Sequence, residues 1–413
     1  MRLFLFSVET VASELNDDII PSLFRMESAQ LIFTREQLEE REARMLAPYA
    51  AFSRDSAGRE HPEEPPRYRT NFQRDWNRIS HTAAYRRLKF KTQVFPFGQA
   101  DDASRDRLTH TLETVQIATS IARSLGLNED LARAIAMAHD IGHPPFGHAV
   151  EGVLGQLVKH FDHNEHGLKI LRYLEKRYED FYGLNLSLEV LEGLQKHETV
   201  YDRRGANEEF FPGMSPTMEA QVVNAADAIA FRTHDLEDAL RLHVISLEDV
   251  DQAGMDLWRR TGERVAKMSD RVKATQRTRA LIDMMIRDVL EETERRVGRN
   301  SIKSLEDVRV YKDALVSFSA GMQGDADALS RFLHERFYNN FRVVRMVNKG
   351  KRVIEELFRA YDEHPEILPP GLRSEIDKGR EKQSRVIADY IAGMTDRFAI
   401  EEHRRIFSIE HRA

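Results

Sequence analysis

Apolar residues recur at intervals of three and four over most of the chain, and this period predicts helices. One long helix is predicted over residues 104–125, where the apolar positions run up to a glycine. A second is predicted over residues 128–138, because Asn128 can cap its first turn. Gly142 and the two prolines that follow predict its end, with the glycine in a left-handed conformation.

The same pattern predicts helices on both sides of this pair. A short charged helix is expected over residues 34–46, and residues 53–66 are rich in Gly, Pro and charge, which is typical of a linker. Ser215 and Pro216 are expected to cap and start a helix that runs to residue 240. Further charged amphipathic helices are expected over residues 252–267, 276–296, 325–347 and 354–361, followed by a loop over 363–371 and a final helical pair.

These elements suggest three segments. Residues 1–66 form an N-terminal arm and linker, residues 67–245 a core, and residues 246–413 a C-terminal helical region. The apolar start of the chain is too short for a signal peptide and acids follow it at once, so we expect a disordered or loosely docked arm. Met1 and Met26 are both candidate starts.

Composition narrows the chemistry. The 413 residues include 41% apolar ones, which can supply a sizeable core, and the net charge of -7 argues against a general nucleic-acid or membrane coat. No apolar run approaches the ~18 residues of a membrane span, so we expect no membrane partner. Because the chain has no cysteine, a metal must be held by His, Asp or Glu, and a cytoplasmic location fits best.

Candidate metal ligands gather at the end of the helix over 128–138. His139 and Asp140 fall in its last turn, where unsatisfied carbonyls favour a cation. His110 lies near the start of the preceding helix, and an adjacent antiparallel helix would bring it to the same ion. Asp227 lies on an apolar helix face, where an unpaired carboxylate is costly, and it is the fourth candidate. A structural pairing of Asp227 with a core arginine or histidine is the alternative.

Two stretches are locally basic. Residues 67–91 contain eight basic residues and one acid, with aromatic residues between them. This stretch is either a solvated helical face or an anion site for polyphosphate or a single strand. Arg342, Arg345, Lys349, Lys351 and Arg352 form a second cluster, for which a solvated face is favoured over a contact with phosphate, an effector or single-stranded DNA.

His110, His139, Asp140 and Asp227 together match the H...HD...D pattern of the HD-domain phosphohydrolases. From about Thr34 to the C-terminal helices the chain resembles the bacterial deoxyguanosine triphosphate triphosphohydrolase family. The resemblance rests on the stretches RTNFQRD (69–75), YRRLKFKTQVF (85–95), HDIGHPPFGH (139–148) and THDLED (233–238). It implies an all-α fold, with an HD-domain helical core and an additional C-terminal helical region.

The resemblance also implies roles for further residues. His148 and Glu151 are three apart, hence on one helix face, and resemble the catalytic dyad of the family. His143 is expected to contact phosphate, as is Arg107, which lies one turn before His110. A reading in which His143 and His148 only satisfy loop carbonyls is the alternative.

On the sugar side, Gln93 resembles the residue that reads the sugar or base. Phe231 and Asp235 fall where the family packs the deoxyribose and binds its 3'-hydroxyl. The family commonly has Tyr at the position of Phe231, so a hydroxyl is missing here and discrimination against ribonucleotides is in question. Asp227 is followed by Ala228 rather than by a polar residue, which removes one substrate contact.

The family activity is hydrolysis of a deoxynucleoside triphosphate (dNTP) to deoxynucleoside and inorganic triphosphate with one divalent metal ion per site. Mn²⁺ or Mg²⁺ is expected in assay, and the ligand set also suits Fe²⁺, Ni²⁺ or Zn²⁺. The expected partners are a dNTP substrate, a dNTP effector, other copies of the chain in a hexamer or tetramer, and single-stranded DNA. The alternatives are another HD-type nucleotide phosphohydrolase, or a non-catalytic assembly that senses nucleotides or binds single-stranded nucleic acid.

Overall fold

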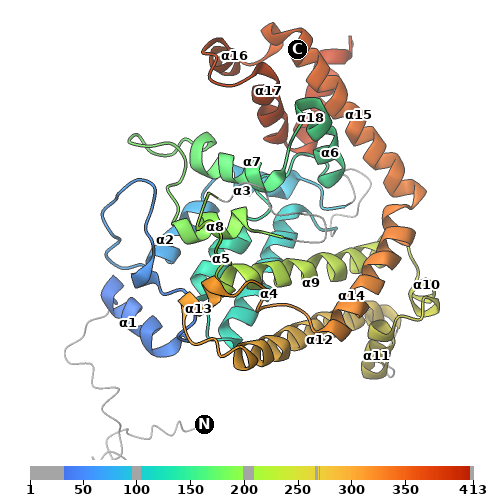
Figure 1. Cartoon of the computed structure of the whole chain (residues 1–413). Coiled ribbons are helices and arrows are strands. Elements are labelled where there is room, and N and C mark those ends of the chain that lie inside the picture. The colour runs from blue at the N-terminus through green and yellow to red at the C-terminus, as the bar shows by residue number, and fades with distance from the viewer. Residues whose placement is uncertain (1–31, 95–103, 199–208, 266–267, 269, 410–413) are drawn as a thin grey trace, which may run out of the picture.

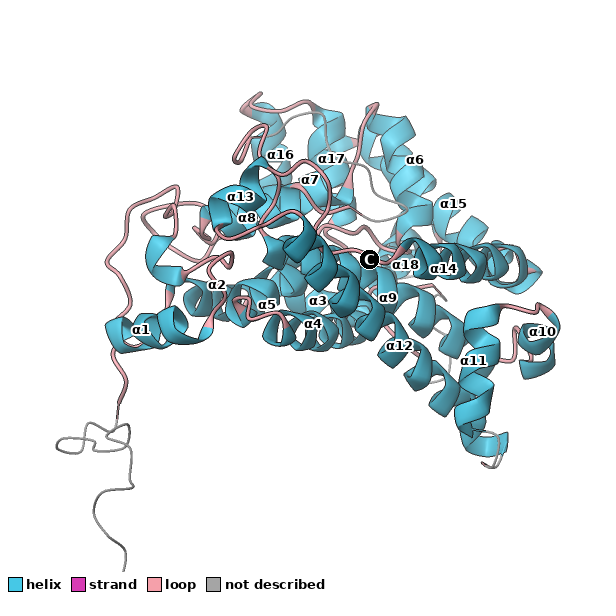
Figure 2. Cartoon of the chain, turned by 60° about the horizontal axis from the view of Figure 1, so that its bottom comes forward, coloured by secondary structure: helices cyan, strands magenta, loops and turns pink. Residues whose placement is uncertain are grey.

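The computed structural model of the chain describes residues 32–94, 104–198, 209–265, 268 and 270–409. Regular structure in these residues is helical throughout, and their only β-type pairings are three isolated bridges (Figure 1, Figure 2). The expected all-α fold is therefore confirmed. Residues 1–31 of the arm and linker expected over 1–66, with both candidate starts, lie outside the described residues.

The helices of the first half are α1 (Arg35–Met45), η3 (Ser53–Asp55), α2 (Asn71–Ser80), α3 (Ala83–Arg87), η4 (Leu88–Phe90), α4 (Arg107–Ser124), α5 (Glu129–Ala138), α6 (His148–Val158), α7 (His163–Lys169), η5 (Ile170–Leu174), α8 (Leu188–Gln195) and α9 (Met218–Arg241). Those of the second half are α10 (Leu247–Gln252), α11 (Asp256–Val265), α12 (Asp270–Arg299), α13 (Leu305–Val310), α14 (Ala320–Leu333), η6 (His334–Tyr338), α15 (Phe341–Glu363), η7 (Pro365–Ile367), α16 (Pro370–Asp377), α17 (Gln383–Ala392) and α18 (Asp396–Phe407).

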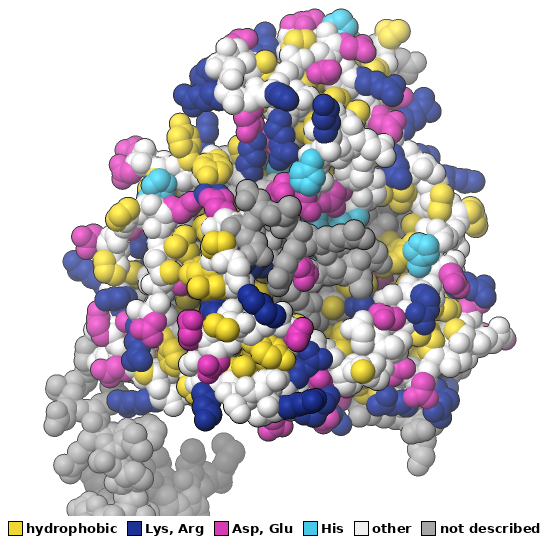
Figure 3. All heavy atoms as spheres, in the orientation of Figure 1, with side chains coloured by type: hydrophobic (Ala, Val, Ile, Leu, Met, Phe, Trp, Pro, Cys, Tyr) yellow, Lys and Arg dark blue, Asp and Glu magenta, His cyan; other side chains and the backbone are white. Residues whose placement is uncertain are grey.

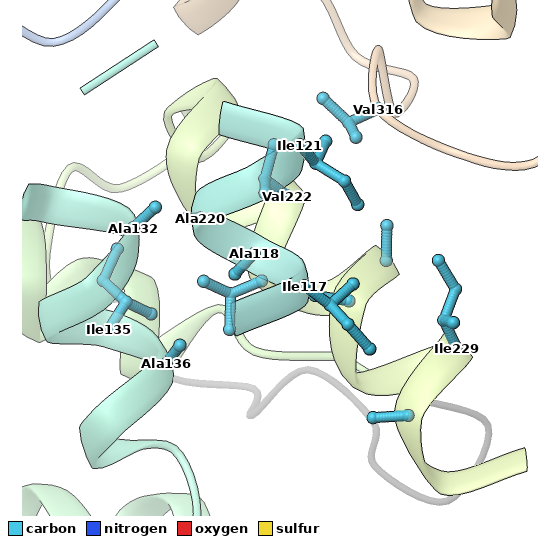
Figure 4. Close-up of a cluster of buried hydrophobic side chains, with 14 of the residues drawn as sticks. Ile117, Ala118, Ile121, Ala132, Ile135, Ala136, Ala220, Val222, Ile229 and Val316 are labelled. Atoms are coloured by element: carbon cyan, nitrogen blue, oxygen red, sulfur yellow. The ribbon is translucent and has the colours of Figure 1, made fainter. Parts of the chain in front are cut away.

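Helices α4, α5 and α9 pack against one another at the centre of the main core (Figure 1). Figure 4 shows Ile117 and Ile121 of α4 near Ile135 of α5 and near Val222 and Ile229 of α9, all of them buried. Each pair on one helix is spaced at about one or two turns, so the apolar period places these side chains on one face. The packing brings the start of α4 and the end of α5 next to the middle of α9.

Local signals fixed the ends of α4 and α5 much as expected. The Asp106 carboxylate accepts the N–H of Thr109 at the start of α4, and Gly126 follows its end with a φ of 66°. The Asn128 side chain accepts the N–H groups of Asp130 and Leu131 at the start of α5.

The conformation of Gly142 differs from the one predicted. It is not among the described residues with positive φ, so the expected left-handed stop is wrong. The glycine is needed for another reason, because a Cβ there would collide with the carbonyl oxygen of His163 and the backbone nitrogen of Gly167. The loop after α5 therefore lies directly against α7, and this close approach holds the histidines of the two segments together.

The start of α9 also differs from the expectation. Thr217 is the N-cap and accepts the N–H of Ala220, while the Ser215 hydroxyl donates to the carbonyl of Tyr311. Ser215 thus ties the approach to α9 to the segment after α13 and does not cap the helix. Two cap-forming side chains lie two residues apart, and only tertiary contacts decide which of them caps the helix.

The helix expected over residues 325–347 is broken. Helix α14 ends at Leu333, a π-helical turn covers 334–338, and Asn340 caps the new helix α15 by accepting the N–H of Arg342. The helix expected over 354–361 is part of α15, and the loop expected over 363–371 contains η7 and the start of α16. The region expected as one helix over 252–267 holds the end of α10 and all of α11, and residues 266–267 lie outside the described ones.

The buried apolar residues form two clusters. The main cluster joins the helices around α4, α5 and α9 to residues as far along as Val343, and the second joins α6 to α15, α17 and α18. Phe146, Val150 and Leu154 belong to the second cluster together with Leu357 and Ile391. Helix α6 therefore packs with the C-terminal helices, and the division at residues 66 and 245 stays a prediction. Among the described helices, none combines the length and apolarity that a bilayer crossing requires.

Candidate functional site

A cavity of about 460 Å³ lies where α4, α6 and α9 meet η6 and α15. Every candidate residue except Glu151 lines it. Those lining residues are Gln93, Arg107, His110, His139, Asp140, His143, His148, Asp227, Phe231 and Asp235. Residues from four separated stretches, with three predicted roles, thus share one cavity, and Glu151 is hydrogen-bonded to His148 of its lining.

Three helices bring the expected metal ligands together. His110 lies one turn into α4, His139 is the C-cap of α5, and Asp227 lies near the middle of α9. The Nε2 atom of His110 is 3.0 Å from Oδ1 of Asp227, and Nε2 of His139 is 3.7 Å from the same oxygen. One atom from each of His110, His139 and Asp140 lies within 4.8 Å of the other two. We call His110, His139, Asp140 and Asp227 the cation cluster.

The hydrogen bonds around the cation cluster leave acceptors directed at its centre. The carbonyl of Ala136 lies 2.7 Å from Nδ1 of His139 and can only accept, so Nδ1 carries the proton and Nε2 presents a lone pair. This Nε2 atom and Oδ2 of Asp140 are buried and have no hydrogen-bond partner. Unpaired buried acceptors are costly, and a divalent cation is the group that satisfies two of them at once. The residues present therefore fit a metal ion.

The pKa directions agree with this fit. Burial would raise the pKa of Asp140, but Arg107 and His143 hold it well below its usual value, and His110 does the same for Asp227. Burial lowers the pKa of His139 further than the nearby carboxylates raise it. For His110 burial also acts downward, but Asp227 outweighs it and the pKa is raised. Two carboxylates are thus ionised beside a neutral imidazole.

The second group of histidines lies beside the first. His148 is the first residue of α6, and its Nδ1 atom is 3.0 Å from Oε2 of Glu151 one turn along. The other carboxylate oxygen of Glu151 accepts from the backbone N–H of His163 at 2.7 Å and lies 2.9 Å from its ring Nδ1. Burial would raise the pKa of Glu151, but these two imidazoles hold it well below its usual value. The side chain of His148 is 44% exposed, so its other nitrogen is accessible from the cavity.

His143 connects the two groups. Its Nδ1 atom is 2.8 Å from Oδ1 of Asp140, and its Nε2 atom is 3.3 Å from Nε2 of His148. Its ring stacks on that of His163 with centroids 3.8 Å apart. Burial, and then the charge of Arg107, hold the pKa of His143 well below its usual value. We call His143, His148, Glu151 and His163 the dyad cluster.

Arg107 does not stand free in the cavity. Its guanidinium donates to Oδ1 of Asp140 at 2.8 Å, and the side chain is buried. A bulkier residue at Gly147 would press on the guanidinium, because a Cβ there lies 2.9 Å from one of its nitrogens. Arg107 therefore places a positive charge between the cation cluster and the loop before α6.

The candidates for sugar recognition also line the cavity. Phe231 is buried on α9, with the guanidinium of Arg232 4.6 Å from its ring centre. Asp235, one turn further on, accepts a hydrogen bond from the hydroxyl of Tyr338 in η6. Burial, opposed by this bond, raises the pKa of Asp235 to about 7. Gln93 also lines the cavity, with its buried side-chain oxygen lacking a partner.

Several residues at the site were not predicted as site residues from the sequence. His163 and His197 line the cavity, and His234 lies 3.4 Å from His110 between their Nδ1 atoms. Tyr338 and Lys351 reach the cavity from the C-terminal helices. His234 lies in the THDLED stretch (233–238) and Lys351 in the second basic cluster, but no motif marks His163, His197 or Tyr338, which packing brings to the cavity. The one local indication of His163 is its position directly after Asp162, which caps α7 through its side chain.

Some residues of the two basic stretches have acidic partners. Arg74 and Arg78 both bind Glu63, and Arg59 binds Asp75. In the second cluster, Arg352 pairs with Glu356 and Lys351 lines the cavity. Figure 3 shows acidic and basic side chains interspersed over the face it draws. These contacts give Arg74 and Arg78 acidic partners, and the choice between a solvated face and an anion site for residues 67–91 stays a prediction.

Comparisons with known proteins agree with the site. The HD domain family matches residues 107–232, which hold the whole cation cluster, and the phosphohydrolase-associated domain matches residues 316–405.

Relatives match along most of the chain. A deoxyguanosinetriphosphate triphosphohydrolase-like protein of Geobacter sulfurreducens is 46% identical over 88% of this chain and 95% of that protein. Proteins of the same description from Ralstonia nicotianae and Bordetella pertussis are 44% and 41% identical, over 88% of this chain and 95% and 97% of theirs. The chain therefore belongs to the deoxyguanosinetriphosphate triphosphohydrolase-like family of HD-domain proteins.

Proposed function

We propose that this protein hydrolyses a deoxynucleoside triphosphate to deoxynucleoside and inorganic triphosphate in a metal-dependent reaction. The observation that carries the proposal is the arrangement of the cavity. The cation cluster, His148 with its partner Glu151, and Phe231 meet at one cavity, which all of them except Glu151 line. The names of the relatives and the HD domain match support the reaction class.

His110, His139, Asp140 and Asp227 would hold the divalent ion. Their two carboxylates supply two negative charges, and the lone pair of His139 Nε2 points at the same centre. When bound, the ion would polarise the α-phosphate and lower the pKa of a water beside it. The donor set of imidazoles and carboxylates suits Mn²⁺, Fe²⁺, Ni²⁺ or Zn²⁺, and we expect Mn²⁺ or Mg²⁺ to support activity in assay.

His148 would exchange the proton during cleavage at the α-phosphate. Glu151 bonds its Nδ1 atom, which fixes the ring orientation and holds Nε2 beside Nε2 of His143 in the cavity lining. Glu151 is in turn fixed by two bonds to His163, so we assign it a positioning role. His143 would contact phosphate through the Nε2 atom that faces His148.

Positive charge for the triphosphate would come from two sides. Arg107 lies beside Asp140, and Lys351 enters from α15. On the sugar side, Phe231 would pack against the deoxyribose, Asp235 would bind the 3'-hydroxyl and Gln93 would read the sugar or base. The hydroxyl of Tyr338, bonded to Asp235, would stand in for the one that Phe231 lacks.

The test is an assay of products. Purified protein with each dNTP and Mn²⁺ or Mg²⁺ should release inorganic triphosphate and a deoxynucleoside in equal amounts. Release of pyrophosphate or of single phosphates would instead identify another HD-type nucleotide phosphohydrolase. Binding of nucleotide or single-stranded DNA without any hydrolysis would favour the non-catalytic alternative, and steep salt dependence would mark the nucleic-acid case.

We further propose that the enzyme works in the cytoplasm as a hexamer or tetramer, with a dNTP effector and single-stranded DNA as additional partners. Phe341 and Val344 on α15 expose apolar surface beside the cavity helices, which supports contact with another copy. Mass measurement in solution, with and without each dNTP, tests the assembly and the effector. A monomer at all concentrations would contradict it.

A further inference from the structure

A second cavity, of about 390 Å³, lies behind the loop that carries His143. It shares no lining residue with the first cavity. Helix α3, the segments α7 and η5, and the stretch from α17 to α18 contribute its walls (Figure 1). Ile141 lies in its wall, one residue after the HD pair, so one loop separates the two spaces. The volume is in the range of small-molecule pockets.

His166 presents an unused acceptor to this cavity. The side chain is 0% exposed, and its Nδ1 atom lies 2.9 Å from the carbonyl oxygen of Gly142. A carbonyl can only accept, so Nδ1 carries the proton and Nε2 holds the lone pair. That Nε2 atom is buried and has no hydrogen-bond partner. Burial lowers the pKa of His166 to about 3, which keeps the ring neutral.

A second acceptor stands next to it. Oδ1 of Asp389 is 3.7 Å from Nε2 of His166 and has no hydrogen bond, although Arg385 lies 3.2 Å away as an ion-pair partner. The other oxygen of Asp389 accepts from Lys169 at 2.5 Å, which holds the carboxylate in place. Two acceptors cannot bond each other, and Lys169 and Arg385 already pair with the charge of Asp389, so a neutral group that donates twice matches both atoms without adding charge.

The other lining residues indicate the charge and polarity of a molecule that would carry these donors. Two acids, Glu175 and Asp389, and two bases, Arg87 and Lys91, balance in charge. Lys91 is already bonded to the carbonyls of His143 and Ala392. The other walls are mostly apolar, which suits a flat uncharged body, and they are formed by Ala84, Ile141, Ile170, Leu174, Met394 and Phe398.

We propose that this cavity is a binding site for an uncharged heteroaromatic molecule that donates adjacent N–H groups to Nε2 of His166 and Oδ1 of Asp389. Bound water is the competing occupant, since a water can also donate twice. The size and the apolar walls favour the larger molecule. The site does not depend on the proposed reaction, because none of its lining residues belongs to the first cavity.

The test uses a pair of probes that differ in their donors. 2-Aminobenzimidazole carries adjacent N–H donors, whereas 1-methylbenzimidazole has a similar ring and none. The sample is full-length protein with ¹⁵N-labelled histidine, in a buffer alkaline enough to keep both probes uncharged. 2-Aminobenzimidazole should then shift the Nε2 resonance of His166 in a saturable way. The second should bind at least about tenfold more weakly, since buried acceptors would stay unmatched.

Three variants complete the test. Ala84→Leu fills the cavity and His166→Phe removes the acceptor, and each should weaken 2-aminobenzimidazole at least about tenfold by calorimetry. Should His166→Phe fail to fold, Ala84→Leu carries the test alone. His148 lines the other cavity, so the His148→Ala variant should bind 2-aminobenzimidazole with the affinity of the wild type. No saturable shift, equal binding of both probes, or unchanged binding in Ala84→Leu would overturn the proposal.

Discussion

The cation cluster and the dyad cluster lie side by side in one cavity and use the same residue types, but they differ in how their acceptors are employed. In the cation cluster, Nε2 of His139 and Oδ2 of Asp140 are buried without a partner. In the dyad cluster, both oxygens of Glu151 already accept hydrogen bonds, from His148 and His163. Both groups are close enough to hold an ion, so proximity alone does not separate them.

The two clusters differ in the exposure of their side chains and in their hydrogen-bond partners. A cation binds where several unprotonated ligand atoms converge. Proton exchange instead needs an imidazole with one nitrogen fixed by a hydrogen bond and the other accessible to substrate. His139 satisfies the first condition, and His148, with a side chain that is 44% exposed, satisfies the second. Similar side chains are thereby suited to separate tasks.

The largest effect is expected from Asp140→Asn. Loss of this charge should remove the bound metal and lower activity by at least about 10³-fold, because a metal supplies several kcal/mol of transition-state stabilisation. Metal analysis of the purified variant beside a dNTP product assay measures both. Asp283→Asn, at an exposed aspartate on α12, is the matched control and should keep metal and activity. A metal content equal to the wild type would contradict the assignment of the cation cluster.

The second-largest effect is expected from His148→Ala, a change in the dyad cluster. We expect kcat to fall by about 10²–10³-fold, the range for removal of a general acid or base, with the metal content unchanged. His160→Ala, at an exposed histidine paired with Glu165, is the control and should be neutral. If His148→Ala lost the metal as Asp140→Asn does, the dyad cluster would be part of the metal site and the distinction would fail.

Tyr338→Phe tests the wall that both clusters face. Loss of the hydroxyl bonded to Asp235 should raise KM for the dNTP about three- to tenfold and narrow the preference over the ribonucleotide, since one hydrogen bond contributes about 1 kcal/mol. Steady-state kinetics with a dNTP and its ribose counterpart measure the change. Tyr182→Phe, at an exposed tyrosine, is the control. Unchanged kinetics would remove Tyr338 from substrate recognition.

The smallest effect is one of pH on stability. The pKa of Asp235 is raised to about 7 by burial, so the folded state binds more protons than the unfolded state between about pH 4 and 7. This contribution to stability is present at low pH and is lost as pH rises through about 7. Asp235→Asn should therefore gain in free energy of unfolding relative to the wild type from pH 5 to pH 8, as measured by urea denaturation.

Asp283→Asn should leave the pH dependence of unfolding unchanged and serves as the reference for Asp235→Asn. A constant difference between wild type and Asp235→Asn over this range would show that Asp235 titrates normally. The carboxylate would then be hydrated more fully than its burial indicates.

The sequence by itself determined the helices around the cation cluster and their order. Asn128 caps α5 through its own side chain, and Gly126 ends α4, because caps and apolar periods act within a few residues. His110 and His139 could be paired on this basis because α4 and α5 are consecutive in the chain, whereas Asp227 lies on the distant helix α9 and was singled out by the HD pattern.

Tertiary structure alone decided what covers the cluster. The break before α15 brings Tyr338 and Lys351 to the cavity, Gly142 is required by contact with α7, and His166 faces a second space. These features depend on which surfaces of distant helices meet. That choice is set by packing over the whole core and not by any local pattern of residues, so the chain determines it only when folded.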